Sequence, residues 1–288
     1  MKNNIIEFYN QYKKNKSALV GTYIVLILIF CAIFAPLLTD YDPLIQDISN
    51  RLIPPMWDEG GSFAHILGTD DFGRDMFSRI IYGARISLTI GIVSVGISLI
   101  FGVIMGAISG YFGGLTDLII MRIVDIMLSI PAILLAIVIV AILGPDLFNA
   151  MIAIGVVGIP TFARIVRSSV LGEKEKEYVM ASRVNGSRNL RLISKVVLPN
   201  CTTPIIVQAT MGFASAVLEA AGLSFLGLGA QPPTPEWGAM LADSLQFITT
   251  APWMIVYPGI AIFLTVMGFN LVGDGLMDVL DPKMKGRA

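Results

Sequence analysis

Uncharged, mostly apolar runs of about 20 residues recur along the chain, and they constrain its fold more than any other feature. A helix that crosses a bilayer needs about 20 predominantly apolar residues. Six runs have this character or come close to it: Leu19–Leu38, Ile86–Gly110, Ile126–Pro145, Leu147–Ala163, Val196–Leu218 and Ala251–Gly273. The first is too long for the apolar region of a signal peptide, and no small-residue cleavage site follows it. The sequence therefore predicts an all-α, polytopic membrane protein with six transmembrane helices.

The composition excludes a soluble fold. Of the 288 residues, 55% are hydrophobic and only 14% are charged, whereas about a quarter of the residues in a soluble domain are charged. The formal net charge of −1 gives no indication of nucleic-acid binding. The two cysteines, Cys31 and Cys201, are far apart, and His65 is the only histidine. We therefore predict no disulfide framework, no metal site and no cofactor.

Basic residues fall mainly on one side of the predicted membrane. If the six spans alternate in direction, sixteen of the 20 Lys and Arg residues lie on the same side. They are Lys2, Lys13, Lys14, Lys16, Arg122, Arg164, Arg167, Lys174, Lys176, Arg183, Arg188, Arg191, Lys195, Lys283, Lys285 and Arg287. Cytoplasmic connections carry such an excess. Both termini and the connection of residues 164–199 are therefore expected in the cytoplasm.

Small and rigid residues predict how some of the spans pack and bend. Gly102, Gly106 and Gly110 lie four apart on one face of the second span, which favours close approach of another helix backbone. The alternative explanation is that membrane helices are rich in glycine in any case. Pro131 and Pro204 each remove a backbone hydrogen bond and can kink the third and fifth spans.

The 164–199 connection is too long for a tight turn and too polar to be embedded. Its pattern predicts two short helices. The first covers Glu173–Asn185 and ends at Gly186, where glycine can take the left-handed terminating conformation. Ser187 caps the second, which extends to about Val197, and Pro199 marks the start of the fifth span. The alternative is a solvated loop with incidental helicity, but this connection is too well patterned for disorder.

Each predicted helix of this connection has a distinctive face. The first gathers Tyr178, Ala181, Ser182 and Asn185, so two small side chains allow another surface to approach beside an aromatic one. The second has apolar and basic residues on opposite faces, which is typical of a helix that lies along a membrane surface. The apolar residues are Leu190, Ile193 and Val197, and the basic residues are Arg188, Arg191 and Lys195.

Two acidic residues near the spans are candidates either for a solute path or for a structural polar role. Asp125 follows Arg122 by three residues on one helix, so an ion pair between them is its simplest explanation. Glu219 has no charged neighbour in the sequence from Val196 to Pro235. Because intramembrane acids usually face an interior, Glu219 either lines a solute path or holds a hydrogen-bonded structural position.

The external connection between the first two spans is rich in acids. Asp70, Asp71 and Asp75 suggest calcium binding, but they lack the EF-hand spacing and its closing glutamate. We favour the interpretation that Thr69 or Asp70 caps a helix leading into the second span, and we expect His65 at the surface.

Three motifs resemble those of one protein family. Met180-Ala181-Ser182, Gly186 and Val196-Val197-Leu198-Pro199 keep the spacing of the "EAA" loop of ABC importer permeases, although Met180, Ser182 and Val196 depart from the consensus. The run from Glu177 to Arg183 looks like the version found in dipeptide, oligopeptide and nickel permeases. Two external segments, 67–88 and 223–238, resemble the signature of the C-type subunit of that family. The resemblance extends from the first span to Asp281-Pro282, nearly the whole chain.

The resemblance implies a type I ABC importer transmembrane domain in the cell membrane. Such a C-type subunit pairs with a B-type permease subunit to form the translocation path. Two cytoplasmic ABC ATPase subunits dock below, and an extracytoplasmic solute-binding protein delivers the solute. The resemblance assigns ATPase coupling to Glu177, Tyr178, Ala181, Ser182, Arg183, Gly186, Leu198 and Pro199.

The residues themselves agree with a non-enzymatic role. The chain has no Gly-Lys dipeptide, hence no P-loop of the usual form, and no Ser/His/Asp or Cys/His set. Energy must come from a partner or from an ion gradient. A stand-alone secondary transporter is therefore the alternative function, although the repeated halves common in such proteins are not evident. Peptides are the favoured solute, but a dipeptide, an oligopeptide, glutathione, nickel and a metal chelate all stay open.

The predicted organisation has four parts along the chain. They are a cytoplasmic segment (1–17), the first transmembrane helix with its external connection (18–80), a core permease domain (81–280) that includes the 164–199 connection, and a cytoplasmic tail (281–288).

Overall fold

The computed structural model describes residues 11–280, and this part of the chain is helical, with one isolated β-bridge between Thr69 and Asp75 and no strand. Lys2, Lys283, Lys285, Arg287 and the predicted tail of residues 281–288 lie outside the described residues. The α-helices are α2 (Lys16–Leu38), α3 (Met76–Phe112), α4 (Gly114–Ser129), α5 (Ala132–Leu143), α6 (Leu147–Glu173), α7 (Glu177–Val184), α8 (Asn189–Arg191), α9 (Thr202–Phe225), α10 (Trp237–Ser244) and α11 (Trp253–Leu280). Shorter helical turns cover Ile48–Asn50, Leu192–Val197, Leu198–Cys201 and Leu245–Phe247.

Five of the helical segments are long and apolar enough to cross a membrane. They are α2, α3, α6, the helical run Asn189–Phe225 that contains α8 and α9, and α11. The pair α4 and α5 makes a sixth if it is counted as one bent span. The prediction of a polytopic all-α membrane protein is confirmed. One straight helix over Ile126–Pro145 is not present, because the two halves of this segment meet at 94°.

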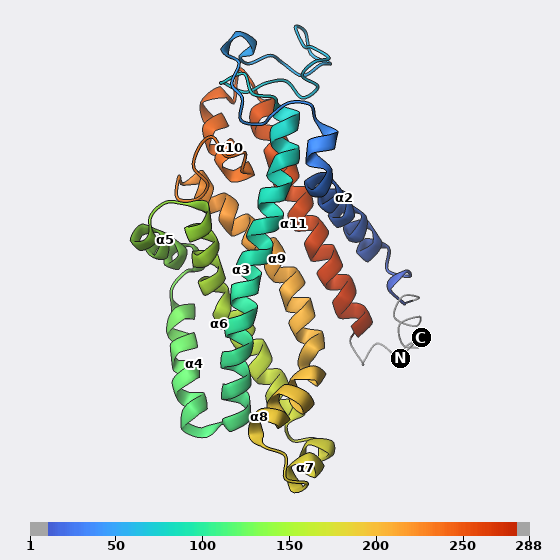
Figure 1. The fold of residues 1–288 in the computed structure, drawn as a ribbon, viewed down its shortest axis with the longest axis vertical. Helices are drawn as coiled ribbons and strands as arrows, with labels where there is room; N and C mark the ends of the chain where they lie inside the picture. The colour runs from blue at the N-terminus through green and yellow to red at the C-terminus, as the bar shows by residue number, and fades with distance from the viewer. Residues whose placement is uncertain (1–10, 281–288) are drawn as a thin grey trace.

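The break in the third span follows from Pro131. Proline has no N–H to donate and disfavours a helical conformation in the residue before it. Accordingly α4 ends at Ser129, Ile130 is extended, and α5 starts after Pro131. In Figure 1, α4 stands beside α3, whereas α5 is turned nearly at right angles to α4 and projects from the side of the bundle. Pro204 causes no such break, since it lies in the first turn of α9, where a backbone N–H has no acceptor within that helix.

The predicted glycine seam is present and joins α3 to α6, the most extensive helix pair among the described residues. Gly102, Gly106 and Gly110 are all buried against α6. A Cβ atom at Gly106 would lie 2.5 Å from the carbonyl oxygen of Ala163, and one at Gly102 would lie 2.4 Å from the Cβ of Phe162. Only glycine allows the two backbones to approach this closely.

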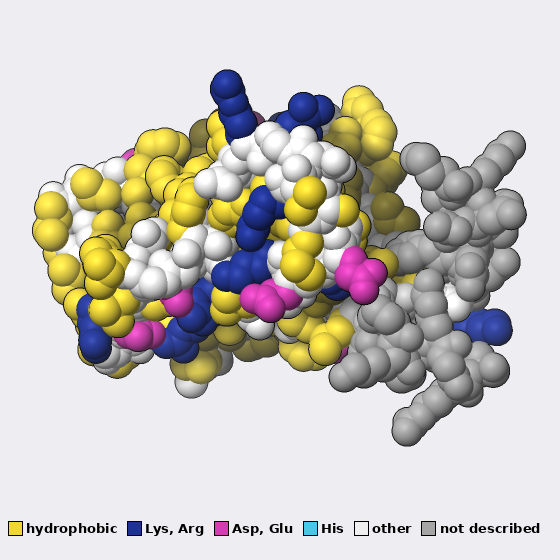
Figure 2. All heavy atoms as spheres, turned by 90° about the horizontal axis from the view of Figure 1, so that it is seen from below, with side chains coloured by type: hydrophobic (Ala, Val, Ile, Leu, Met, Phe, Trp, Pro, Cys, Tyr) yellow, Lys and Arg dark blue, Asp and Glu magenta, His cyan; other side chains and the backbone are white. Residues whose placement is uncertain are grey.

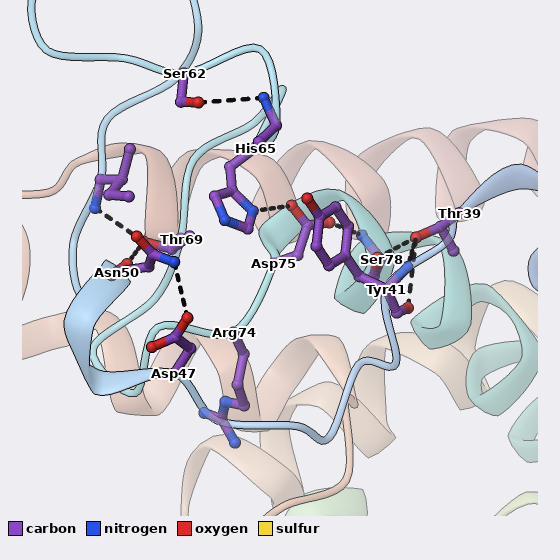
Figure 3. A network of polar contacts seen from close by, with 12 residues as sticks. Thr39, Tyr41, Asp47, Asn50, Ser62, His65, Thr69, Arg74, Asp75 and Ser78 are labelled. Carbon is purple, nitrogen blue, oxygen red and sulfur yellow. Dashed lines mark hydrogen bonds and ion pairs between the residues drawn. The ribbon is translucent and has the colours of Figure 1, made fainter.

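A buried polar network holds the external connection, residues 39–75, against the start of α3 (Figure 3). His65 Nδ1 lies 3.0 Å from Asp75 Oδ1, and both side chains are buried. Asp75 also accepts a hydrogen bond from the Ser78 amide at 2.7 Å and so caps α3. The expectations of a surface His65 and of a cap by Thr69 or Asp70 are both wrong.

Thr69 and Asp70 have other partners in the same region. The Thr69 hydroxyl donates to the Asn50 carbonyl at 2.6 Å, and Asp70 pairs with buried Arg74 at 2.6 Å. The local sequence does not reveal that the connection folds back on itself, and this fold places both residues against non-helical neighbours.

Candidate functional site

The 164–199 connection forms the end of the molecule opposite the external connection (Figure 1). Within it, α7 packs through Val179, which is completely buried in a cluster with Val170, Leu192 and Val197. These partners come from α6 and from the helical turn before α9. The short helix α7 is therefore held by the last turn of α6 and by the helical turn before α9, and it is not a free loop.

The two predicted helices of this connection are present with different bounds. α6 continues to Glu173, so the first short helix is only Glu177–Val184. Gly186 has a φ of +79°, the left-handed conformation expected after this helix. Arg188 stands at the N-cap of α8 with no side-chain cap, so the predicted Ser187 cap is wrong.

The second predicted helix does not stop before the fifth span. Residues 189–225 form one helical run that passes through a π-helical turn and a 3₁₀ turn at Leu198–Cys201. Pro199 is tolerated because it lies in the first two positions of that 3₁₀ turn. The predicted apolar face is divided. Ile193 and Val197 are buried within the chain, while Leu190 is exposed.

Three contacts tie this connection to the end of α3. Lys174 Nζ donates to the Gly110 carbonyl at 2.8 Å, and the Tyr111 hydroxyl donates to Asn189 Oδ1 at 3.0 Å. The guanidinium of Arg183 lies 5.8 Å from the centre of the Tyr111 ring, within cation–π range. The Arg183 contact comes from α7 itself, whereas Lys174 follows α6 and Asn189 begins α8, so the segments on both sides of α7 are also joined to α3.

The outer side of α7 has exposed apolar and small side chains. Met180, Ala181 and Val184 are exposed, and Val184 is 86% accessible. Figure 2 shows this underside of the molecule, where apolar, basic and acidic side chains lie side by side. Exposed apolar side chains next to polar ones mark surfaces that bind other proteins. The sequence pattern predicted Ala181 here but did not single out Val184.

The other residues assigned to coupling have varied surroundings. Glu177 is exposed in the first turn of α7, and the Ser182 hydroxyl donates to the Tyr178 carbonyl at 2.8 Å. Leu198 is partly buried and Pro199 is exposed. Tyr178 is half-exposed and donates its hydroxyl to Glu173. Partial burial and this hydrogen bond raise the pKa of Tyr178 to about 12, so the phenol keeps its proton at neutral pH.

Two ion pairs join α4 to α6. Arg167 Nε lies 2.6 Å from Asp117, and Arg164 lies 2.6 Å from Asp125. The predicted pair between Arg122 and Asp125 is wrong, because α6 places Arg164 closer to the carboxylate. The Asp125 pair is half-exposed on both sides and is expected to contribute little to stability.

A cavity of about 200 Å³ lies among α3, α4, α5, α6 and α9. Its polar lining consists of Ser94, Ser98, Thr161, Gln208, Ser215 and Glu219. Leu128 and Ala132, on either side of the break in the third span, line it as well. Glu219 is partly buried and accepts no hydrogen bond and forms no ion pair within residues 11–280.

Comparison with known proteins gives consistent matches over nearly the whole chain. Residues 98–286 match the family model of the binding-protein-dependent transport system inner membrane component, and residues 6–55 match that of the N-terminal TM domain of oligopeptide transport permease C. The chain is 56% identical to the dipeptide transport system permease protein DppC of Alkalihalophilus pseudofirmus, over 97% of this chain and 90% of that protein. It is 51% identical to the di/tripeptide transport system permease protein DppC of Pseudomonas aeruginosa, over 98% of this chain and 93% of that protein.

Among solved structures, the fold resembles a chain of the MetNI methionine ABC transporter in an inward-facing conformation. The TM-score is 0.58 at 22% sequence identity, over 72% of this chain and 98% of that chain. This likeness concerns the fold alone.

Proposed function

The chain belongs to the family of binding-protein-dependent transport system inner membrane components, and from this premise we propose that it carries peptides as the C-type permease subunit of an ABC importer. Members of this family are non-catalytic membrane subunits. In the proposed assembly the chain forms half of the translocation path, and a B-type permease forms the other half. Two cytoplasmic ABC ATPase chains hydrolyse ATP, and an extracytoplasmic protein delivers the solute.

The observation that carries the choice of solute is the high identity to relatives named as dipeptide or di/tripeptide permeases. This identity exceeds 50% and covers nearly all of the chain, including every span that could line a path. A stand-alone secondary transporter lacks support, since the family model matches most of the chain. Short peptides are therefore favoured over nickel, a metal chelate or glutathione.

In the proposed mechanism α7 docks into the ATPase partner. The exposed side of α7 consists of Met180, Ala181 and Val184. The small side chain of Ala181 permits the ATPase surface to come close to this helix. Arg183, whose guanidinium lies over the Tyr111 ring, then connects this helix to α3. A movement of the ATPase that shifts α7 thereby shifts the inner ends of α3 and α6, which are packed together by the glycine seam.

The proposed orientation has both termini in the cytoplasm. The 164–199 connection contains eight basic residues, from Arg164 to Lys195. Such an excess is typical of cytoplasmic connections. The ATPases are therefore expected at the α7 end, and the solute-binding protein at the opposite end.

Reconstitution of the whole importer tests this proposal. The chain is co-expressed with a B-type permease, the ATPase subunits and the binding protein, and the complex is placed in proteoliposomes. Labelled dialanine should enter only with ATP and the binding protein. The uptake of labelled nickel and of labelled glutathione is measured separately under the same conditions. ATP-dependent uptake of nickel or glutathione without uptake of dialanine would overturn the assignment of peptides.

A further inference from the structure

One face of α9 carries a polar stripe at membrane depth. Gln208, Gly212, Ser215 and Glu219 follow one another at spacings of four, three and four residues, so they lie along one side of the helix. From Gln208 to Glu219 the stripe extends for about 16 Å along the helix axis. All four residues line the cavity of about 200 Å³ described above. The stripe therefore faces an open space inside the bundle.

The side chains of this stripe have no partners in the described residues. Glu219, Gln208 and Ser215 form no side-chain hydrogen bond or ion pair within residues 11–280. The two serines of α3 in this lining behave differently. Ser94 donates to the Met151 carbonyl at 3.0 Å, and Ser98 donates to the Gly155 carbonyl at 2.7 Å. Those two serines join α3 to α6, so the free hydrogen-bonding capacity of the cavity lies mainly on α9.

The cavity also lies at the break in the third span. Leu128 lies in the last turn of α4 and Ala132 begins α5, and both line the same space. Non-helical backbone at membrane depth is tolerated where it is buried in protein or lines a cavity. Secondary transporters, a different class of transporter, show that broken helices can form solute sites at membrane depth. The interrupted backbone and the polar stripe thus point to one place.

The charge of the cavity is unbalanced. Glu219 is the only charged residue in its lining, and neither Lys nor Arg is present there. A carboxylate at membrane depth is costly unless it meets an opposite charge or hydrogen-bond donors. Glu219 and the Ser215 hydroxyl, one helical turn away, offer several acceptors to one cationic donor group. A primary ammonium group, with three N–H donors, satisfies this arrangement.

We propose that this cavity is a passage site for the α-ammonium group of the solute, with Glu219 as its counter-charge. The proposal rests on the proposed function, in which the solute is a short peptide. The volume is below the range of about 300–1,000 Å³ that is usual for ligand pockets. The site therefore holds one group of the peptide as it passes and does not enclose the whole molecule.

The test uses the complete importer in proteoliposomes with labelled dialanine. Glu219→Gln keeps the shape of the side chain and removes its charge, so uptake should fall by about tenfold, the effect of losing one charge-assisted contact. Glu219→Asp should retain most of the uptake. Glu59→Gln, an exposed glutamate on the external connection, serves as the matched control and should leave uptake unchanged.

A second-site variant separates a charge requirement from a structural role. Ser215 lies one helical turn from Glu219 and lines the same cavity. The double variant Glu219→Gln with Ser215→Glu returns a carboxylate to the stripe and should recover a substantial part of the uptake. A purely structural hydrogen bond of Glu219 would not be recovered in this way.

The outcomes distinguish the two proposals. A wild-type complex that does not take up dialanine with ATP overturns the proposed function. A wild-type complex that does, with unchanged uptake in Glu219→Gln, overturns only the role of Glu219. Loss of assembly in Glu219→Gln, without recovery by Ser215→Glu, also overturns it and assigns the residue a structural role.

Discussion

At the scale of single residues, α3 contains two kinds of glycine, those that face another helix and those that do not. Gly106 faces α6, and a Cβ atom there would lie 2.5 Å from a backbone oxygen. Gly96 is on the same helix, yet nothing lies within 4 Å of the place where its Cβ would be. Gly106→Ala should therefore destabilise the protein by about 1–3 kcal/mol through overpacking. Gly96→Ala is the matched control and should leave the stability unchanged or slightly higher.

Thermal unfolding of the two alanine variants in the same detergent checks this prediction. The midpoint for Gly106→Ala should lie several degrees below that of Gly96→Ala. Equal midpoints would mean that α3 and α6 do not pack as closely as the backbone positions require.

Residue roles were predictable only where the partner was local or the spacing itself was the signal. The glycine seam was predicted, because its four-residue spacing defines a helix face. The roles of Lys174 and His65 were not. The acceptor of Lys174 is a backbone carbonyl 64 residues away, and His65 meets Asp75 only because the external connection folds back. Asp125 pairs with Arg164 and not with Arg122 for the same reason, since its partner lies on another helix far away in the sequence.

At the scale of elements, the apolar runs predicted the positions of the spans, but the prolines alone did not predict which spans are bent. Pro131 separates two helices at 94°, whereas Pro199 and Pro204 lie in a continuous helical run. The difference depends on whether each proline lies in the first turn of a helix or interrupts a run of backbone hydrogen bonds. Predicting this position requires knowing where the neighbouring helices lie. The role of α7 in coupling and the division of the chain at residues 17, 80 and 280 stay predictions.

The coupling role of α7 predicts a specific defect for Ala181→Trp. The indole adds bulk to the exposed face that should meet the ATPase, while buried Val179 on the opposite side is untouched. Insertion and pairing with the B-type subunit should therefore be normal, and dialanine-stimulated ATP hydrolysis should fall by about tenfold or more. Co-purification of the ATPase chains and the hydrolysis rate are the measurements.

The control for Ala181→Trp must leave the anchoring of α7 intact. Lys174 does not qualify, although its position in the sequence suggests a freely exposed charge, because it donates to Gly110. Glu175→Gln is suitable, since this side chain is exposed. Wild-type docking and hydrolysis in Ala181→Trp would show that α7 is not the coupling element.

At the scale of the whole molecule, the bent third span decides which ends of the bundle lie together. In Figure 1, α4 leads the chain away from the end of α3 that lies near α7, and α6 leads it back to α7. The α7 end lies opposite residues 39–75, and the pair α4 and α5 makes a sixth span if it is counted as one. This arrangement agrees with the distribution of the basic residues, which by itself depends on counting six spans.

Cysteine labelling in intact cells tests this arrangement. Glu59 and Glu175 are both exposed glutamates, one on the external connection and the other next to α7, so their replacement by cysteine is a matched pair. Cys31 and Cys201 are first replaced by serine and alanine to remove background labelling. An impermeant maleimide should label Glu59→Cys from outside, and it should reach Glu175→Cys only after the membrane is opened. If α4 and α5 together did not cross, residues 59 and 175 would lie on the same side, and both variants would be labelled in intact cells.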